Sequence, residues 1–393
     1  MTGSARMSSE ACYLFRLAGP PRAKGDPTPD GLAWDEVIRL ANREKAIPAL
    51  FDDRTRVGLA GLSPAQSRRL QEATLGWAVR MAYLEQRLER LLALYHNHGI
   101  RVLLLKGAAL AVTVYRSFSA RPMADLDLLV DADRAMEAWE LARGSGWTRT
   151  VDDQQRRAYE EHQHLPPLDD ARGTGLGLEL HTELLPKGSP FAFDADVLWR
   201  NALRTEVGGQ PGFVPADVDM VLHLCIHFAW SHGLVDAAWR TFRDLQVLID
   251  AGRVDWQELA RRAREARAST CVYWTLRLGR RLSGLAVPDS PLADLAPAAG
   301  EHLLSPVERY FCTVLCAPSE WQDRTILVGR AMWRLAIRPR WSGHGAARPW
   351  GREELFAWAR QASPEARPVT AGNLSFLPRR WRQFFRELRA LAP

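Results

Sequence analysis

The sequence predicts an α+β fold in which a small mixed β-sheet core with helices lies between an N-terminal and a C-terminal helical lobe. Residues 99–215 contain short apolar runs of strand length, and the segments on both sides repeat their apolar residues at helical spacing. A chain of 393 residues is also too long for one ordinary core and suits two or three lobes.

Composition narrows the class of protein. Hydrophobic residues make up 47% of the chain and charged residues 25%, which is a globular balance, and no apolar run is long enough to cross a bilayer. The net charge of +6 suits a protein that handles triphosphates or nucleic acid. Five cysteines form no disulfide framework. Cys312 and Cys316 can share a helix face, but no His or Cys group completes a zinc site beside them. We therefore expect a cytoplasmic protein with structural cysteines.

We divide the chain into five segments. They are a loose leader rich in Gly, Pro and Ser (1–29), a helical lobe (30–98), the α/β core (99–215), a second helical lobe (216–337) and a tail rich in Arg and Trp (338–393).

The N-terminal lobe has two helical signals. In residues 32–50 the side chains of Trp34, Ile38, Leu40 and Ala41 can share one face. Ser63 and Pro64 then mark a helix start, because serine caps the free N–H groups and proline suits the first turn. The amphipathic pattern that follows reaches about His98.

Strands and helices alternate through the core. Apolar runs predict strands at residues 100–105 and 125–130, and alternation of apolar and polar residues predicts a third strand within 174–185. Helical composition is found at 108–115 and 132–143. The second lobe has helical patterns at 217–230, 236–251, 256–266, 272–285, 306–316 and 324–337, with a Pro- and Ala-rich linker at 286–300.

Asp125 and Asp127 are the first candidate site residues. Residues i and i+2 of a strand project from the same face, so the two carboxylates would point together. Two like charges at this distance favour a bridging cation, and Mg²⁺ takes hard oxygen ligands that it shares with phosphates. Glu179, on the third strand, could join the metal site or act as a general base. Taken alone, Asp-x-Asp is more often ordinary surface charge.

Lys106 and Gly107 end one strand and open a helix. Glycine lets the backbone approach a phosphate, and a helix N-terminus offers free N–H groups. The alternative is that Lys106 extends from the strand end to solvent. Arg121 could hold a triphosphate or pair with the acidic cluster.

The stretch GIRVLLLKGAALAVTVYRSFSARPMADLDLLV (99–130) resembles the nucleotidyltransferase superfamily of the polymerase-β type. It is most similar to a bacterial family of uncharacterised nucleotidyltransferases often found near peptide-modification genes, and the resemblance extends over about residues 30–250. It implies a nucleotidyltransferase-like core, with Mg²⁺ on Asp125, Asp127 and Glu179, which are also the implied catalytic residues. Lys106 and Gly107 stand where the broader superfamily has Gly-Ser.

Histidines add to the candidates. His181 is two residues from Glu179 and could orient a carboxylate, contact the nucleotide or pack in the core. His223 and His227 are four apart, and we expect a structural or site-lining role rather than zinc, because no H-E-x-x-H arrangement is present. His162 and His164 would lie on a loop that covers the site.

These residues predict a Mg²⁺-dependent transfer of a nucleoside monophosphate from an NTP to an unidentified acceptor, which is a small molecule, a peptide or a protein. One alternative is a catalytically inactive accessory protein of a peptide-modification pathway. Another is a transferase directed at RNA or tRNA, because basic and aromatic residues alternate in the tail 338–393. The simplest role for that tail is packing on the body of the protein.

Overall fold

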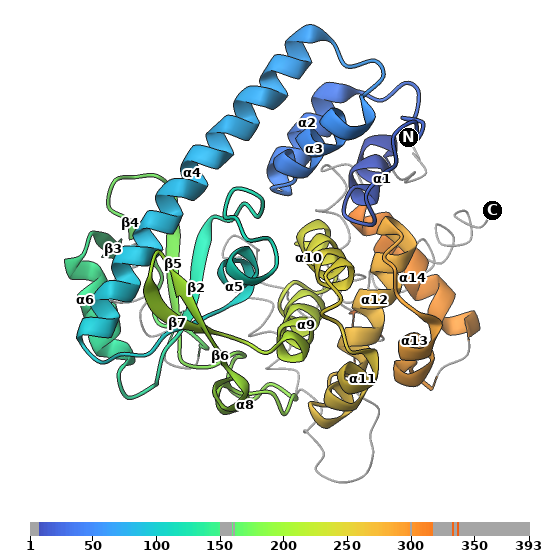
Figure 1. Ribbon diagram of the computed structural model, residues 1–393. Coiled ribbons are helices and arrows are strands. Elements are labelled where there is room, and N and C mark those ends of the chain that lie inside the picture. Colours follow the sequence, from blue (N-terminus) through green and yellow to red (C-terminus); the bar gives the residue numbers. More distant parts are fainter. Residues whose placement is uncertain are drawn as a thin grey trace, which may run out of the picture.

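The computed structural model describes residues 8–149, 159, 162–298, 301–316, 332–333 and 336–337. In this part of the chain a seven-stranded mixed sheet is surrounded by helices, which confirms the α+β prediction (Figure 1). The strands are β1 (Leu103–Leu104), β2 (Asp125–Leu129), β3 (Trp147–Arg149), β4 (Leu168–Asp170), β5 (Gly177–His181), β6 (Leu203–Val207) and β7 (Gln210–Val214). The helices are α1 (Ser9–Arg16), α2 (Trp34–Arg43), α3 (Ile47–Val57), α4 (Pro64–Asn97), α5 (Lys106–Thr113), α6 (Ala135–Gly144), α8 (Ala195–Asn201), α9 (Asp217–Ile226), α10 (Ala238–Asp250), α11 (Trp256–Glu265), α12 (Ser269–Ser283), α13 (Asp289–Leu295) and α14 (Glu301–Leu315).

The strand order is β3-β4-β5-β2-β1-β7-β6. Strand β2 is parallel to β5 on one side and antiparallel to β1 on the other, and β1 is parallel to β7. All three strands predicted from the sequence are therefore central strands. Their apolar residues, such as Leu104, Leu126 and Leu178, are buried almost completely. β1 is apolar on both faces, as is typical of a central strand, whereas β2 and β5 alternate buried leucines with polar residues.

Helix α4 is the long helix that the sequence predicts after Ser63. The Ser63 side chain accepts a hydrogen bond from the Gln66 backbone N–H, and the Gln66 side-chain oxygen accepts one from the Ser63 backbone N–H. Both halves of a capping box are therefore present. The helix runs along the sheet, where it contacts β6, β7 and α6 (Figure 1). Its far end carries α2 and α3, which form the N-terminal lobe.

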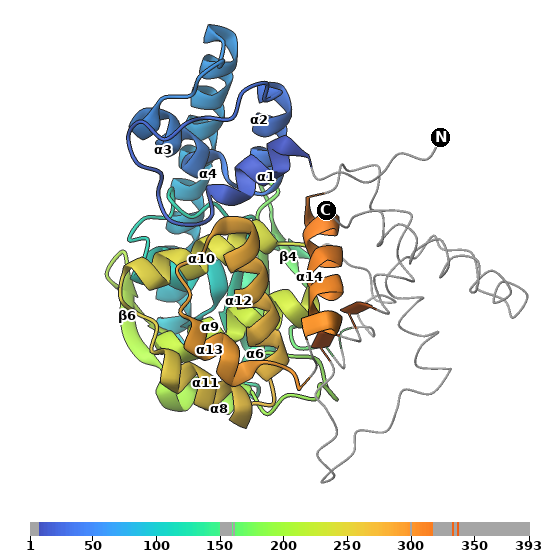
Figure 2. The ribbon, with the colours of Figure 1, turned by 90° about the vertical axis from the view of Figure 1, so that its right-hand side faces the viewer.

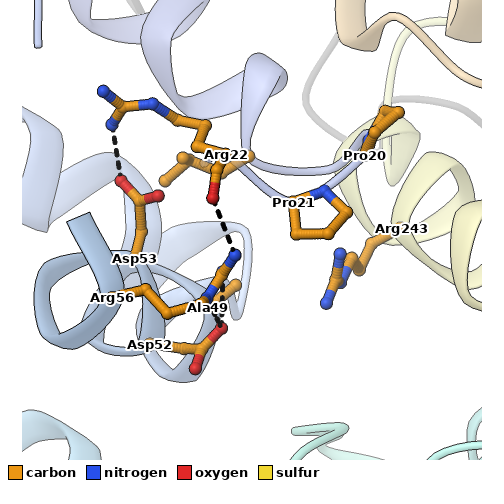
Figure 3. Close-up of a pocket in the computed structure, with 9 residues that line it drawn as sticks. Pro20, Pro21, Arg22, Ala49, Asp52, Asp53, Arg56 and Arg243 are labelled. Carbon is orange, nitrogen blue, oxygen red and sulfur yellow. Dashed lines mark hydrogen bonds and ion pairs between the residues drawn. The ribbon is translucent and has the colours of Figure 1, made fainter. Parts of the chain in front are cut away.

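The leader is more ordered than its composition predicts. Residues 9–16 form α1, whose side chains at Tyr13, Leu14 and Phe15 are buried. The segment after α1 is fastened by Arg22, which forms an ion pair of 2.7 Å with the buried Asp53 of α3 (Figure 3). The cavity beside this pair has a volume of about 10 Å³, enough for roughly one water molecule, so it is part of the packing and not a substrate site.

A β-hairpin lies in a region where the sequence pattern shows no strand. Strands β6 and β7 are antiparallel and are joined at Gly208 and Gly209, which both have positive φ, at 55° and 75°. Two consecutive positive φ values are required by the tight turn that matches the twist of paired strands, and glycine adopts them without strain. This hairpin extends the sheet beyond β1.

Helices α9 to α14 form the C-terminal lobe (Figure 2). The predicted helices at 217–230, 236–251, 256–266, 272–285 and 306–316 are present, with shifted ends. The Pro- and Ala-rich stretch 286–300, expected to be a linker, contains α13, whose Leu292 and Leu295 are buried. The predicted helix at 324–337, apart from four residues, and the tail 338–393 lie outside the described residues.

The five cysteines are all free thiols, and both Cys312 and Cys316 are buried. Among the described residues, no helix combines the length and the apolar character needed to cross a membrane.

Replacing Arg22 tests whether the ion pair fastens the leader. Arg22→Ala should lower the free energy of unfolding by about 3 kcal/mol, because Asp53 would stay buried with only the Tyr13 hydroxyl as a partner. Urea unfolding measures this change. The matched control is Arg39→Ala, which removes an exposed ion pair with Glu36 and should cost less than about 1 kcal/mol. Equal effects of the two variants would contradict the assignment.

Candidate active site

Strands β2 and β5 bring the candidate acidic residues together. Because the two strands are parallel and in register, Asp127 lies directly opposite Glu179, and Asp125 lies opposite Gly177. Side chains at alternate positions share a face, so both aspartates and Glu179 project to the same side of the sheet, as does His181. The intervening Leu126, Leu128, Leu178 and Leu180 face the opposite side and are buried.

The site is open at one end and buried at the other. Asp125, the first residue of β2, is exposed to solvent, and the Glu179 side chain is 29% exposed. Asp127 and His181 are buried, at 6% and 2% exposure. A ligand can therefore approach the group from the Asp125 end, while Asp127 is held within the protein.

The Asp127 carboxylate is the centre of the group. Its Oδ1 accepts a hydrogen bond of 2.8 Å from Lys106 Nζ and one of 2.9 Å from His181 Nε2. Glu179 Oε2 lies 3.5 Å from the same His181 nitrogen and 3.7 Å from His164 Nε2. Asp127 and Glu179 are thus both close to His181, with Lys106 on the Asp127 side and His164 on the Glu179 side.

These contacts decide which groups are charged. Burial alone would raise the pKa of Asp127, but Lys106 and His181 hold it well below its usual value. Burial alone would likewise lower the pKa of Lys106 and of His181, yet their bonds to Asp127 raise both. Asp127 and Lys106 are therefore an ionised pair at neutral pH.

The surroundings shift the pKa of Asp125 and that of Glu179 in opposite directions. Burial would raise the pKa of Glu179, but its hydrogen bond to His181 lowers it. Loss of solvation raises the pKa of Asp125, and the negative charge of Asp127 raises it further. A divalent cation between these two aspartates would remove that repulsion.

The backbone turns sharply where β1 becomes α5. Lys106 has a φ of 45°, in the left-handed region that non-glycine residues rarely adopt. The preceding Leu105 N–H donates to the carbonyl of Asp127, so the turn is tied to the neighbouring strand β2. Strand β2 therefore both stabilises this turn and carries Asp127, the partner of Lys106. The turn places the Lys106 ammonium beside Asp127 instead of in solvent.

Arg121 pairs with a carboxylate of the C-terminal lobe instead of with Asp125 or Asp127. Its Nε and Nη2 donate to the two oxygens of Asp244 on α10, at 2.6 and 2.8 Å, and Tyr115 donates to Asp244 at 2.8 Å. The guanidinium also lies against Gly107, where a Cβ would be 3.7 Å from Arg121 Cζ and 3.4 Å from Met123 Sδ. These are ordinary van der Waals distances, so the start of α5 lies in contact with this buried pair.

Histidines line the buried end of the site. His164 pairs with His181 across an isolated bridge, and their rings are 5.2 Å apart. His162 is 4.3 Å from His164, so the segment predicted to cover the site lies alongside β5. His223 of α9 is buried, and burial together with the charges of Lys106 and His181 lowers its pKa to about 3. His223 is therefore neutral at physiological pH and cannot serve as a cation.

The residues present fit a divalent metal ion. Among the described residues, Asp127, Glu179 and His181 form a group whose potential ligand atoms lie within 4.8 Å of one another. Asp125, on the same face and near the open end, would add a further oxygen. Carboxylate oxygens are the donors that Mg²⁺ prefers, whereas the His181 nitrogen already hydrogen-bonds to Asp127 and suits an orienting role. His223 and His227, with ring centroids 6.2 Å apart, are not part of this group.

The structure also identifies site residues that the sequence pattern did not reveal. Asp244, the partner of Arg121, looks like any acidic residue of an amphipathic helix. Lys45 follows α2, and its ammonium is near enough to Asp125 for their charges to interact. One signal could have singled it out: lysine occurs only at positions 24, 45, 106 and 187 in a chain whose other cations are arginines.

Comparison with known proteins agrees with this geometry. A family model described as an uncharacterised nucleotidyltransferase matches residues 30–284, which include the N-terminal lobe, the sheet and α9 to α12. No curated protein and no solved structure matches the chain.

The lowered pKa of His223 predicts how acid affects stability. Below pH 6.5 the unfolded chain takes up a proton at His223, whereas the folded protein does so only near pH 3, so stability falls as pH falls through this window. His223→Gln should reduce this loss by on the order of 1 kcal/mol per pH unit.

Urea unfolding at several pH values between about 4 and 7 measures the effect. His96→Gln, which replaces an exposed histidine near the end of α4, is the control and should give a curve parallel to that of the wild type. A His223→Gln curve that is also parallel to the wild type would show that His223 is not held neutral.

Proposed function

The chain belongs to the family of uncharacterised nucleotidyltransferases, and on that premise we propose that it transfers a nucleoside monophosphate from an NTP to an acceptor. The observation that carries the proposal is the parallel pairing of β2 and β5, which sets Asp127 beside Glu179 with Asp125 on the same face. Three carboxylates on one face, open to solvent at one end, suit a metal-bound triphosphate.

Asp125, Asp127 and Glu179 would hold Mg²⁺. When bound, the ion would supply positive charge that stabilises the negative charge developing during in-line displacement. His181 orients Asp127 through the 2.9 Å hydrogen bond and keeps the buried carboxylate ionised. The lowered pKa of Glu179 favours a role as a ligand over a role as general base, because a weakly basic carboxylate accepts a proton poorly at neutral pH.

The start of α5 would contact the phosphates. Its first N–H groups are not used by the helix, and Gly107 leaves the backbone there unobstructed by a side chain. Lys106 supplies a fixed positive charge next to Asp127. Without that charge, the Asp127 carboxylate would repel the negative charge of a triphosphate. Lys106 thus serves two anions, the carboxylate within the protein and the phosphate that approaches it.

One observation favours a protein with this fold that binds nucleotide without turnover. Lys106 Nζ is hydrogen-bonded to Asp127 Oδ1, so an ammonium takes up part of the carboxylate that a metal ion would use. Such a protein could act as an accessory factor in peptide modification. The exposed Asp125 and the half-buried Glu179 keep further oxygens for a metal, and for this reason we favour the enzyme.

A cytoplasmic location and an RNA-directed activity are supported by fewer observations than nucleotidyl transfer is. Five free thiols fit a reducing, cytoplasmic environment. An RNA-directed activity rests on the basic tail 338–393, which lies outside the described residues.

Removing the metal ligands tests the enzyme directly. Asp125→Asn and Asp127→Asn should each lower nucleotidyl transfer by about a thousandfold, since several kcal/mol of charge stabilisation would be lost. Transfer is measured by incubating the protein with each labelled NTP and a cell extract. Asp133→Asn, an exposed aspartate shortly after β2, is the control and should keep wild-type activity. Full activity in Asp127→Asn would refute the site.

Pyrophosphate release separates the enzyme from the accessory protein. NTP with Mg²⁺ should raise the melting temperature in both cases, because any ligand that binds only the folded state stabilises it. Pyrophosphate should appear in step with the labelled product only if the protein is a transferase. A melting shift without pyrophosphate, across all four NTPs and the extract, would favour the accessory role.

A further inference from the structure

Lys45 is near enough to Asp125, at the open end of the candidate site, for their charges to interact, although it belongs to the N-terminal lobe. The end of α2 is fixed there by a series of contacts that reach the sheet. Asn42 Oδ1 accepts from Trp77 Nε1 at 3.1 Å, Arg80 stacks on Trp77, and Arg80 Nη2 donates to the Gly175 carbonyl at 2.7 Å. Gly175 precedes β5, whose first residue is paired with Asp125.

Arg240 approaches the same place from the C-terminal lobe. It lies one helical turn before Asp244 on α10, so both side chains share a helix face. That face is directed toward the site, because Asp244 binds Arg121 next to the start of α5. Both views show α10 beside the N-terminal helices, and Trp239 donates to the Leu14 carbonyl of α1 at 2.7 Å (Figures 1 and 2).

The charges of Lys45 and Arg240 act on each other, and the carboxylates that act on them, Asp125 on Lys45 and Asp236 on Arg240, form no ion pair with either. In the part of the chain that the structure describes, neither side chain makes a hydrogen bond or an ion pair. Burial and the charge of Arg240 lower the pKa of Lys45 to about 8, although the charge of Asp125 acts in the opposite direction. Two cations held near each other, neither with a hydrogen bond or a close ion pair among the described residues, indicate a site for an anion.

The backbone adds to this positive potential. Lys45, with a φ of 59°, stands just before the start of α3, and Arg240 lies in the first turn of α10. Neither helix has an acidic residue in its first turn or a side-chain cap. Helix starts usually carry acidic residues or caps, so the cation at the start of α3 is unfavourable in the absence of a ligand, whereas at α10 Asp236 precedes the N-cap and offsets part of the positive charge.

The other charges of the site are already matched. Arg121 is neutralised by Asp244, and Lys106 by Asp127. A triphosphate carries about four negative charges at neutral pH, so about two remain in its complex with one Mg²⁺. Lys45, whose charge acts on Asp125, and Arg240, whose charge acts on Lys45, remain for them.

We infer that Lys45 and Arg240 form a clamp for the terminal phosphates of the nucleotide, so that a bound triphosphate bridges the N-terminal and C-terminal helical lobes over Asp125. The inference rests on the proposed function, because it names groups that would hold the same nucleotide. It adds that each helical lobe contributes a cation to phosphate binding, in addition to the start of α5.

Binding of inorganic tripolyphosphate in the presence of Mg²⁺ tests the clamp without any turnover. Lys45→Met and Arg240→Met should each weaken binding roughly tenfold, and the double variant roughly a hundredfold, by isothermal titration calorimetry. Lys24→Met and Arg68→Met replace exposed cations elsewhere in the N-terminal lobe and should bind as the wild type does. Wild-type affinity in both clamp variants, or no binding by the wild-type protein, would overturn the inference.

Stability separates a binding role from a structural one. Because neither side chain makes a hydrogen bond or ion pair, the ligand-free Lys45→Met protein should melt at or above the wild-type temperature. A clear fall in its melting temperature, with unchanged tripolyphosphate affinity, would instead make Lys45 structural and would contradict the clamp.

The two proposals can fail separately. If labelled NTP is transferred but the clamp variants bind tripolyphosphate normally, the clamp is wrong and the proposed function stands. If the variants lose tripolyphosphate binding but the wild type transfers no label from any NTP, the clamp stands and the proposed function fails.

Discussion

The ionised Asp127 carboxylate is the constraint on which the rest of the site depends. A buried charge is tolerated only when it is paired and hydrogen-bonded, and Lys106 and His181 do both. Their positions require three elements at once: the turn from β1 into α5, the strand β2 and its parallel neighbour β5. The left-handed backbone at Lys106 is an unfavourable conformation that this arrangement maintains, which fits a site built for binding.

The helical lobes are held against the site by polar contacts of the same kind. Arg121 and Asp244 join the strand region to α10, and Arg80 joins α4 to the turn before β5. A buried bidentate pair fixes orientation more strictly than apolar packing does, because two donors must meet two acceptors. These contacts help to hold Lys45 near Asp125 and Arg240 near Lys45, and the proposal that the nucleotide touches both lobes follows from them.

Some parts of the fold were beyond prediction because their stability comes from distant residues. Helix α1 lies in a segment with the composition of a leader, and its Tyr13, Leu14 and Phe15 are buried against helices distant in the sequence, while Arg22 pairs with Asp53 in the segment that follows. The β6–β7 hairpin has mixed polarity, since an outer hairpin is only partly covered, and its clearest local signal was the Gly208–Gly209 turn. Helix α13 was not predicted, because the stretch 286–300 around it is rich in proline and alanine. Its buried side chains pack against the other helices of its lobe.

The sequence by itself determined the local elements that carry the chemistry. Strand period placed Asp125 and Asp127 on one face, and the apolar runs around them identified central strands. Only the tertiary structure decided the pairings, because Glu179 meets Asp127 through strand register, and Arg121 meets Asp244 across a separation of 123 residues. Local spacing reports which side chains can point the same way, whereas contacts between distant segments arise only when those segments pack.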